Sequence, residues 1–270
     1  MNARRNAFTL LELLVVVAIL AILAGGLIVA YSGLEEQQSH GVAAHTLAGT
    51  DRAIRSFVTL NNGRYPNNLD SLVMSDAAAG DEVVDRLHEE AQDKFIVGTL
   101  TANEAAQLER LFQEPVIVRD ADATLYDNDG NFTNDTFDAA VNNMFDLPVL
   151  GGVGVSRTLA AGGAVAMFDT VTPSPEAQEV LLKLRLDPST YTKAIVFGLS
   201  NGSTIAQEGI QGRMPSVPSM YVPRGRYGRL FLVFAVDDND TGSDAKARFV
   251  TVVDAHGHPI DDVVKAYQEP

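Results

Sequence analysis

The chain opens with MNARRNAFTLLELLVVVAILAILAGGLIVAY, residues 1–31, and this stretch determines its class of architecture. Residues 13–31 contain no charged side chain. A helix of that length, with a rise of about 1.5 Å per residue, extends about 28 Å, close to a bilayer core of about 30 Å. Arg4 and Arg5 precede the run, so the N-terminus is expected to stay in the cytoplasm and the remainder to cross the membrane. The sequence therefore predicts a single-pass membrane protein.

Two ordinary explanations of this stretch are incomplete. A cleaved secretory signal has an apolar region of about 7–15 residues and an A-x-A-like site, whereas this run is longer and its alanines never stand two apart. A plain signal anchor accounts for the length and the arginines but gives Glu12 no purpose. A carboxylate drawn to the bilayer centre costs about 2.5–3.5 kcal/mol, so its place at the edge of the run needs a reason.

The run from Arg4 to Ala24 resembles the N-terminal cleavage and methylation motif of type IV pilins and type II secretion pseudopilins. The resemblance implies that a prepilin peptidase cuts between Ala7 and Phe8 and that the new amine is methylated. It also implies that Glu12 pairs with a neighbouring subunit's N-terminal amine in a filament. A carboxylate in hydrocarbon needs such a cation. Ala7 departs from the glycine that the family usually has before the cut.

The resemblance divides the chain into a leader, a spine helix and a globular head. We assign 1–7 to the leader, 8–60 to the spine and 61–270 to a periplasmic head, with an enlarged region at about 76–190. Leu47, Ile54 and Phe57 fall near one helical face of the polar half. The resemblance implies that the first half is anchored in the inner membrane and that the amphipathic second half packs on the head. The glycines of this half predict an imperfect, kinked helix. Asn-Gly and Pro signals in 61–66 end it.

The head is predicted to be α+β, with an antiparallel sheet behind the spine. Helices are expected over 81–94, 102–112, 174–186 and 260–267, and strands over 115–119, 194–199, 230–236 and 248–254. Residues 120–143 and 151–163 are expected to be irregular. Residues 62–72 resemble the segment after the spine in major pseudopilins. Their residue types alone indicate a turn and a short helix capped by Asn67 or Asn68.

Charge and composition exclude several classes of function. The net charge of −15 argues against a nucleic-acid binder, which needs a basic face for phosphates. The chain has no cysteine, so disulfides and thiolate metal sites are excluded. The expected role is structural, in a type IV pilus or a type II secretion pseudopilus, with prepilin peptidase and other pilin-like subunits as partners and no enzymatic activity.

A membrane-anchored periplasmic serine hydrolase is the alternative of a different class. Residues 198–202 match G-x-S-x-G around Ser200, and later aspartates and histidines stand in triad order, namely Asp237, Asp238, His256 and His258. The nucleophile elbow needs a helix directly after the serine, whereas glycines and prolines interrupt the chain there. A glycine turn after a strand explains the pattern more simply.

Two acidic stretches are candidate calcium loops, although neither is an EF-hand. The better one offers oxygen ligands from Asp237, Asp238, Asn239, Asp240 and Asp244. Some pseudopilin heads hold calcium in a C-terminal loop, so the resemblance favours this stretch over 127–131. A third alternative for the whole chain is therefore an uncleaved, anchored binding module stabilised by calcium. His256-x-His258 offers a metal pair without an evident third ligand, and the intervening Gly257 indicates a turn.

Overall fold

The computed structural model describes residues 10–74, 87–112, 115–121, 155–168, 170, 173–186, 191–199, 203–207 and 229–268, with side chains of the first helix described over 13–25 and from Gly41 onward. The helices are α1 (Leu10–Leu60), α2 (Glu89–Gln92), α3 (Ala102–Leu111), α6 (Pro175–Lys183), α7 (Thr204–Gln207) and α8 (Ile260–Gln268). The strands are β1 (Leu69–Met74), β2 (Phe95–Thr99), β3 (Ile117–Ala121), β4 (Val155–Thr158), β5 (Ala164–Phe168), β6 (Lys193–Gly198), β7 (Phe231–Val236) and β8 (Arg248–Val253).

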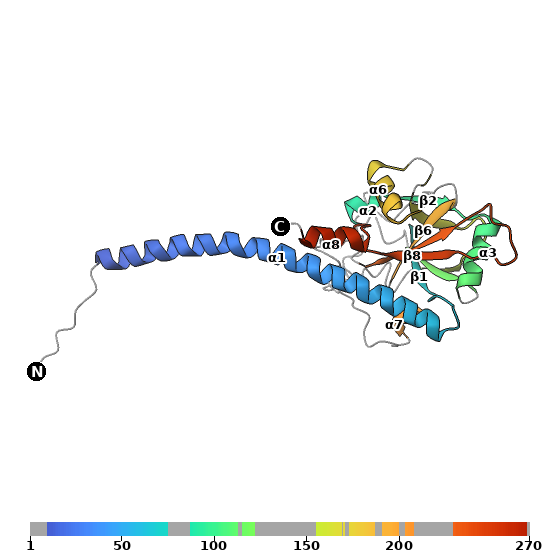
Figure 1. Cartoon of the computed structure of the whole chain (residues 1–270), viewed down its shortest axis with the longest axis horizontal. Coiled ribbons are helices and arrows are strands. Elements are labelled where there is room, and N and C mark those ends of the chain that lie inside the picture. Colours follow the sequence, from blue (N-terminus) through green and yellow to red (C-terminus); the bar gives the residue numbers. More distant parts are fainter. Residues whose placement is uncertain are drawn as a thin grey trace, which may run out of the picture.

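Helix α1 forms a spine that extends well beyond the head (Figure 1). Its 51 residues correspond to about 76 Å at a rise of about 1.5 Å per residue. The helix continues through Gly41 and Gly49 without a break, and its axis is curved rather than straight (Figure 1). It ends where predicted, because Asn62 and Gly63 take positive φ values of 55° and 82° and the Gly63 amide bonds the Val58 carbonyl at 2.8 Å.

The second half of α1 docks on the head through one stripe of side chains. Buried residues recur at intervals of three and four, as expected for one helical face, namely Ala43, Leu47, Thr50, Ile54 and Phe57. Val42 and His45, on other faces, are exposed. The predicted amphipathic second half of the spine is therefore confirmed.

The described strands form one curled sheet of eight strands around β6, which pairs with β5, β1 and β7. Most pairs are antiparallel, as predicted, but β1 and β3 run parallel, so the sheet is mixed. Strand β7 is buried along its whole length. Leu232 and Phe234 point to one side, with α1, α3 and α8, and Phe231 and Val233 to the other, with α2 and α6. Helices therefore cover both faces of the sheet (Figure 1).

The chain after Asn68 forms strand β1 rather than the predicted short helix. Asn67 ties this segment to β3 instead of capping a helix: its Oδ1 accepts from the Ile117 amide at 2.7 Å and its Nδ2 donates to the Pro115 carbonyl at 2.7 Å. Asn68 turns the chain with a φ of 57°, and β1 follows directly. Side-chain bonds to a distant strand have therefore replaced the local cap.

Two other predictions of local structure need correction. The helix expected over 81–94 is helical only at Glu89–Gln92 within the described residues, and Phe95 starts a strand that pairs with Phe168. The segment 151–163, expected to be irregular, contains strand β4, which pairs with β3. Residues 122–154, which include the predicted loop after Asp120 and the second acidic stretch, lie outside the described residues.

Candidate functional site: the apolar segment and the acidic hairpin

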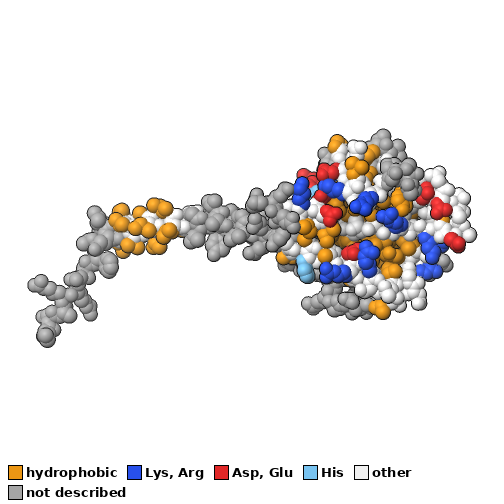
Figure 2. Space-filling model, in the orientation of Figure 1, with side chains coloured by type: hydrophobic (Ala, Val, Ile, Leu, Met, Phe, Trp, Pro, Cys, Tyr) orange, Lys and Arg blue, Asp and Glu red, His pale blue; other side chains and the backbone are white. Residues whose placement is uncertain are grey.

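The apolar segment, residues 13–25 of α1, is exposed at every position. Its large side chains include Leu13 at 61% exposure and Ile22 at 75%. Figure 2 shows the segment as a hydrophobic band on the projecting part of the helix, away from the head. A helix that is hydrophobic all round belongs in a core or a membrane, so this segment requires a covering that the described part of the chain does not provide.

The residues expected to direct processing and assembly precede the apolar segment in the sequence. Glu12 is the third residue of α1 and directly precedes the apolar segment. Its side chain is outside the described part, as are Ala7 and Phe8. The roles expected of all three therefore stay predictions. Over the residues that the structure describes, no helix reaches the combined length and apolarity of a membrane span.

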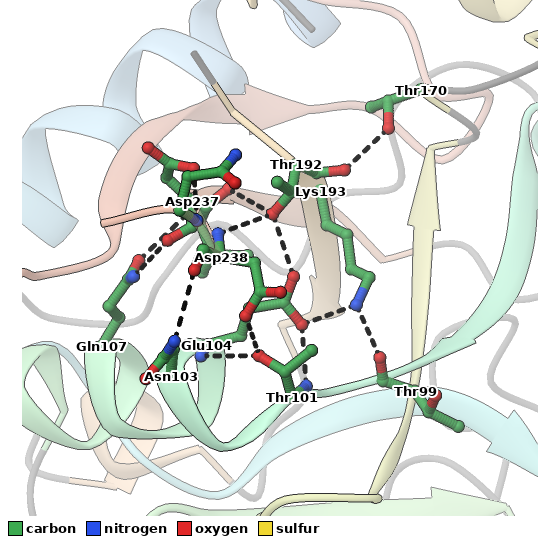
Figure 3. A network of polar contacts seen from close by, with 12 residues as sticks. Thr99, Thr101, Asn103, Glu104, Gln107, Thr170, Thr192, Lys193, Asp237 and Asp238 are labelled. Carbon is green, nitrogen blue, oxygen red and sulfur yellow. Dashed lines mark hydrogen bonds and ion pairs between the residues drawn. The ribbon is translucent and has the colours of Figure 1, made fainter. Parts of the chain in front are cut away.

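The acidic hairpin, residues 237–247 between β7 and β8, is held to helix α3 by Gln107 (Figure 3). The buried Gln107 amide nitrogen donates to the carbonyls of Asp237 at 2.6 Å and Asp240 at 3.2 Å. Its oxygen accepts from the Asp237 amide at 3.1 Å. A neutral amide thus satisfies two carbonyl oxygens of the kind that a cation would use.

A buried ion pair lies beneath the hairpin. The Glu104 carboxylate, which has no exposed surface, contacts Lys193 Nζ at 2.6 Å. It also accepts from the Thr192 hydroxyl at 3.0 Å and the Thr101 amide at 2.9 Å. The Asp238 amide donates to the same Thr192 hydroxyl at 2.9 Å, and the Asp238 side chain accepts from Thr101. Helix α3, strand β6 and the hairpin therefore share one hydrogen-bond network (Figure 3).

Part of this network was visible in the sequence. Thr101 and Glu104 stand in the T-x-x-E spacing of a capping box, and both reciprocal bonds form at the start of α3. Lys193 and Gln107 were missed, because nothing local links them to residues about 90 and 130 positions away. Only the packing of α3 against the end of β7 brings these groups together.

The side chains proposed for calcium are near one another in sequence but do not converge. Asp237 and Asp240 accept from backbone amides of their own turn, at Asn239 and Gly242. Asp244 is exposed. No group of three or more His, Asp or Glu side chains in the described ranges is placed to hold a metal ion. Calcium at this hairpin stays a prediction from the sequence.

The acids and histidines of the alternative triad occupy opposite ends of one hairpin. Asp237 and Asp238 follow the last residue of β7, whereas His256 and His258 follow the last residue of β8. Because Phe231 pairs with Val253, a whole strand separates the two groups, about 17–20 Å at about 3.3 Å per residue. Ser200 lies outside the described residues. The four described residues therefore do not assemble as this triad requires.

Comparison with known proteins identifies a sequence motif at the N-terminus. Residues 2–28 match the family model described as "Prokaryotic N-terminal methylation motif". The chain therefore carries the prepilin-type signal of type IV pilin-like proteins. No curated protein and no solved structure matches the chain significantly. The motif supports a pilin-like protein processed as a prepilin, and it ends within α1.

Proposed function

We propose that this chain is a structural pilin-like subunit, assembled through its N-terminal helix into a type IV pilus or a type II secretion pseudopilus. The observation that carries the proposal is the apolar segment, exposed all round and set inside the matched motif. A helix of this kind is stable only when lipid or other apolar helices surround it. In this proposal lipid covers the helix while the subunit is in the membrane, and other apolar helices cover it in the filament.

In the membrane stage, the apolar run of 13–31 anchors the subunit in the inner membrane. Arg4 and Arg5 hold the N-terminus in the cytoplasm, and the head folds in the periplasm. Prepilin peptidase then cuts between Ala7 and Phe8 and the new amine is methylated. The first half of α1 projects from the head (Figure 1), and this supports the arrangement because a projecting helix can enter a bilayer without bringing the head into it.

In the filament stage, the same helices pack against one another. Apolar helices gain little from hydrophobic burial when they leave lipid, so close packing and polar pairs must hold them. Ala18, Ala21 and Gly25 provide small positions for close approach, and Glu12 provides a carboxylate for a neighbour's amine. The head carries no chemistry in this proposal; it forms the outer surface of the filament.

The decisive experiment is intact-mass and N-terminal peptide analysis of the protein purified from its native membrane. We expect a chain that begins at a methylated Phe8. As a matched control, Ala7→Leu places a bulky side chain at the cut, and this variant is expected to retain Met1. A wild-type chain that keeps Met1, or that lacks the whole apolar run, would refute the proposal.

A further inference from the structure

The three described histidines of the head lie together, although they are far apart in the sequence. His88 precedes α2, and His256 and His258 lie in the turn between β8 and α8. The ring centroids of His88 and His256 are 3.9 Å apart. Those of His256 and His258 are 6.0 Å apart, with nearly parallel planes. This cluster connects the start of α2 to the chain that leads into the C-terminal helix.

Asp254 shapes the turn that holds two of these rings. Its Oδ1 accepts from the amides of His256 at 3.0 Å and His258 at 2.7 Å, and Gly257 takes a φ of 78°. Its Oδ2 is 3.5 Å from His256 Nδ1, and neither buried atom has a hydrogen-bond partner in the described part of the chain. Burial raises the pKa of the Asp254 carboxyl, but its contacts with His256 and His258 outweigh burial and lower the pKa overall. Asp254 thus stays ionised in mild acid.

Helix α2 contributes the groups that close the cluster. His88 is its N-cap, and the His88 Nδ1 accepts from the Glu90 amide at 3.4 Å. Glu90 Oε2 is 3.1 Å from His258 Nε2. The buried Lys94 ammonium donates to the His256 carbonyl at 2.8 Å and lies 3.9 Å from Glu90 Oε2. An imidazole nitrogen that accepts a hydrogen bond is unprotonated, so the His88 contact depends on its charge state.

Charges of both signs surround the cluster. The charged groups near the cluster on its three flanking helices are Glu90 and Lys94 of α2, Glu179 and Lys183 of α6, and Asp262 and Lys265 of α8. Lys183 already pairs with both Glu179, at 2.7 Å, and Asp262, at 2.5 Å. Asp254 and Glu90 contact His256 and His258, Glu179 also interacts electrostatically with His258, and Lys94 accompanies them as a buried cation.

We propose that His88, His256 and His258 form a pH-sensitive latch that holds α2 to the β8–α8 turn at neutral pH and loosens in mild acid. Protonation of His88 removes the acceptor that caps α2. A cation on His258 lies in a partly buried site and is repelled by Lys94, and the attraction of Asp254 and Glu90 does not make up for this cost. Helix α8 begins at Ile260, directly after the latch, and buries Val263 in the core that α1 shares. Loosening the latch therefore weakens the hold of the C-terminal helix on the spine.

The direction of the pH effect follows from burial. Burial lowers the pKa of His258 and Lys94 lowers it further, against the raising effects of Asp254 and Glu90, and the pKa is lowered overall. In the unfolded chain, histidine titrates at about 6.5. Below that pH the unfolded chain binds the proton more readily than the folded one, so folding loses stability. The latch is at full strength above about pH 6.5 and weakens as the pH falls through the lower folded pKa.

Hydrogen exchange of the full-length protein in detergent, at pH 7.5 and 5.5 with intrinsic rates corrected, tests the latch. The loss of protection in peptides covering 259–268 is expected to reach about tenfold in the wild type at the lower pH. The double variant His88→Asn, His258→Gln keeps a cap acceptor and an amide donor, but its substituted side chains cannot titrate. Its protection over 259–268 should fall less than about threefold at the lower pH. His45→Gln, at an exposed position on the spine, should behave as the wild type.

The proposal is overturned if the wild type and the double variant lose equal protection at pH 5.5, or if the wild type loses none. If the double variant does not fold at pH 7.5, the wild type still decides the question through NMR titration of the His258 ring. A midpoint below about 6.5 supports the proposal and one at or above that value overturns it. The inference does not depend on assembly into a filament, so the mass measurement at the N-terminus tests the proposed function separately.

Discussion

Replacing Lys193 by methionine removes one partner of the buried ion pair beneath the acidic hairpin. Lys193 Nζ lies 2.6 Å from the Glu104 carboxylate, whose side chain has no exposed surface, while the Lys193 side chain is 19% exposed. Removing one partner of a buried pair costs about 3–5 kcal/mol. Two donors, the Thr101 amide and the Thr192 hydroxyl, remain on Glu104, so we expect the lower end, about 3 kcal/mol. That corresponds to roughly a hundredfold in the folding constant.

Urea unfolding of the full-length protein in detergent, followed by near-ultraviolet circular dichroism of its Tyr and Phe residues, measures this loss. Lys183→Met is the matched control, because Lys183 pairs near the surface with Glu179 and Asp262, whose side chains are 68% and 20% exposed. This variant should lose far less unfolding free energy than Lys193→Met. Adding Glu104→Gln to Lys193→Met should recover part of the loss, since no uncompensated charge stays buried. A Lys193→Met midpoint equal to that of Lys183→Met would refute the reasoning.

Three further outcomes are expected. Leu47→Ala should destabilise the docking of the spine by about 2–5 kcal/mol, whereas Val42→Ala, at a 50% exposed position of the same helix, should change it little; equal urea midpoints contradict this. Glu12→Ala should leave membrane insertion intact and impair assembly, so recovery of other subunits at wild-type yield in a pull-down counts against the proposed pairing. Calcium at the acidic hairpin should raise the melting temperature of the full-length protein, and a temperature unchanged by a chelator argues against it.

Several elements of the head were predictable because their signals are local. Ser174 and Pro175 mark the start of α6, and the Ser174 hydroxyl accepts from the Ala177 amide at 3.1 Å. The apolar run at 230–236 indicated the strand that the structure shows as β7. In each case the residues that indicate the element lie within it or directly beside it, and tertiary packing did not change the predicted structure.

Other elements were missed because distant partners determine them. Strand β2 is short and follows a charged stretch, and its pairing with Phe168 in β5 makes it a strand. Parallel pairing of β1 with β3 is likewise supported from a distance, because the Asn67 side chain, just before β1, bonds the Pro115 carbonyl and the Ile117 amide at the start of β3. Residue propensity does not include a hydrogen bond to a residue about 50 positions away, so the sequence around Asn67 alone favoured a helix.

The sequence alone determined the processing motif, the length of the spine and the apolar character of its first half, since these depend only on which residues follow one another over short distances. The tertiary structure decided which polar groups meet. Glu104 finds Lys193, and His88 finds His256 and His258, only because the sheet brings α3 to one end of the β7–β8 hairpin and α2 to the other. Contacts between residues about 90 to 170 positions apart arise from the packing of whole elements, which no local pattern records.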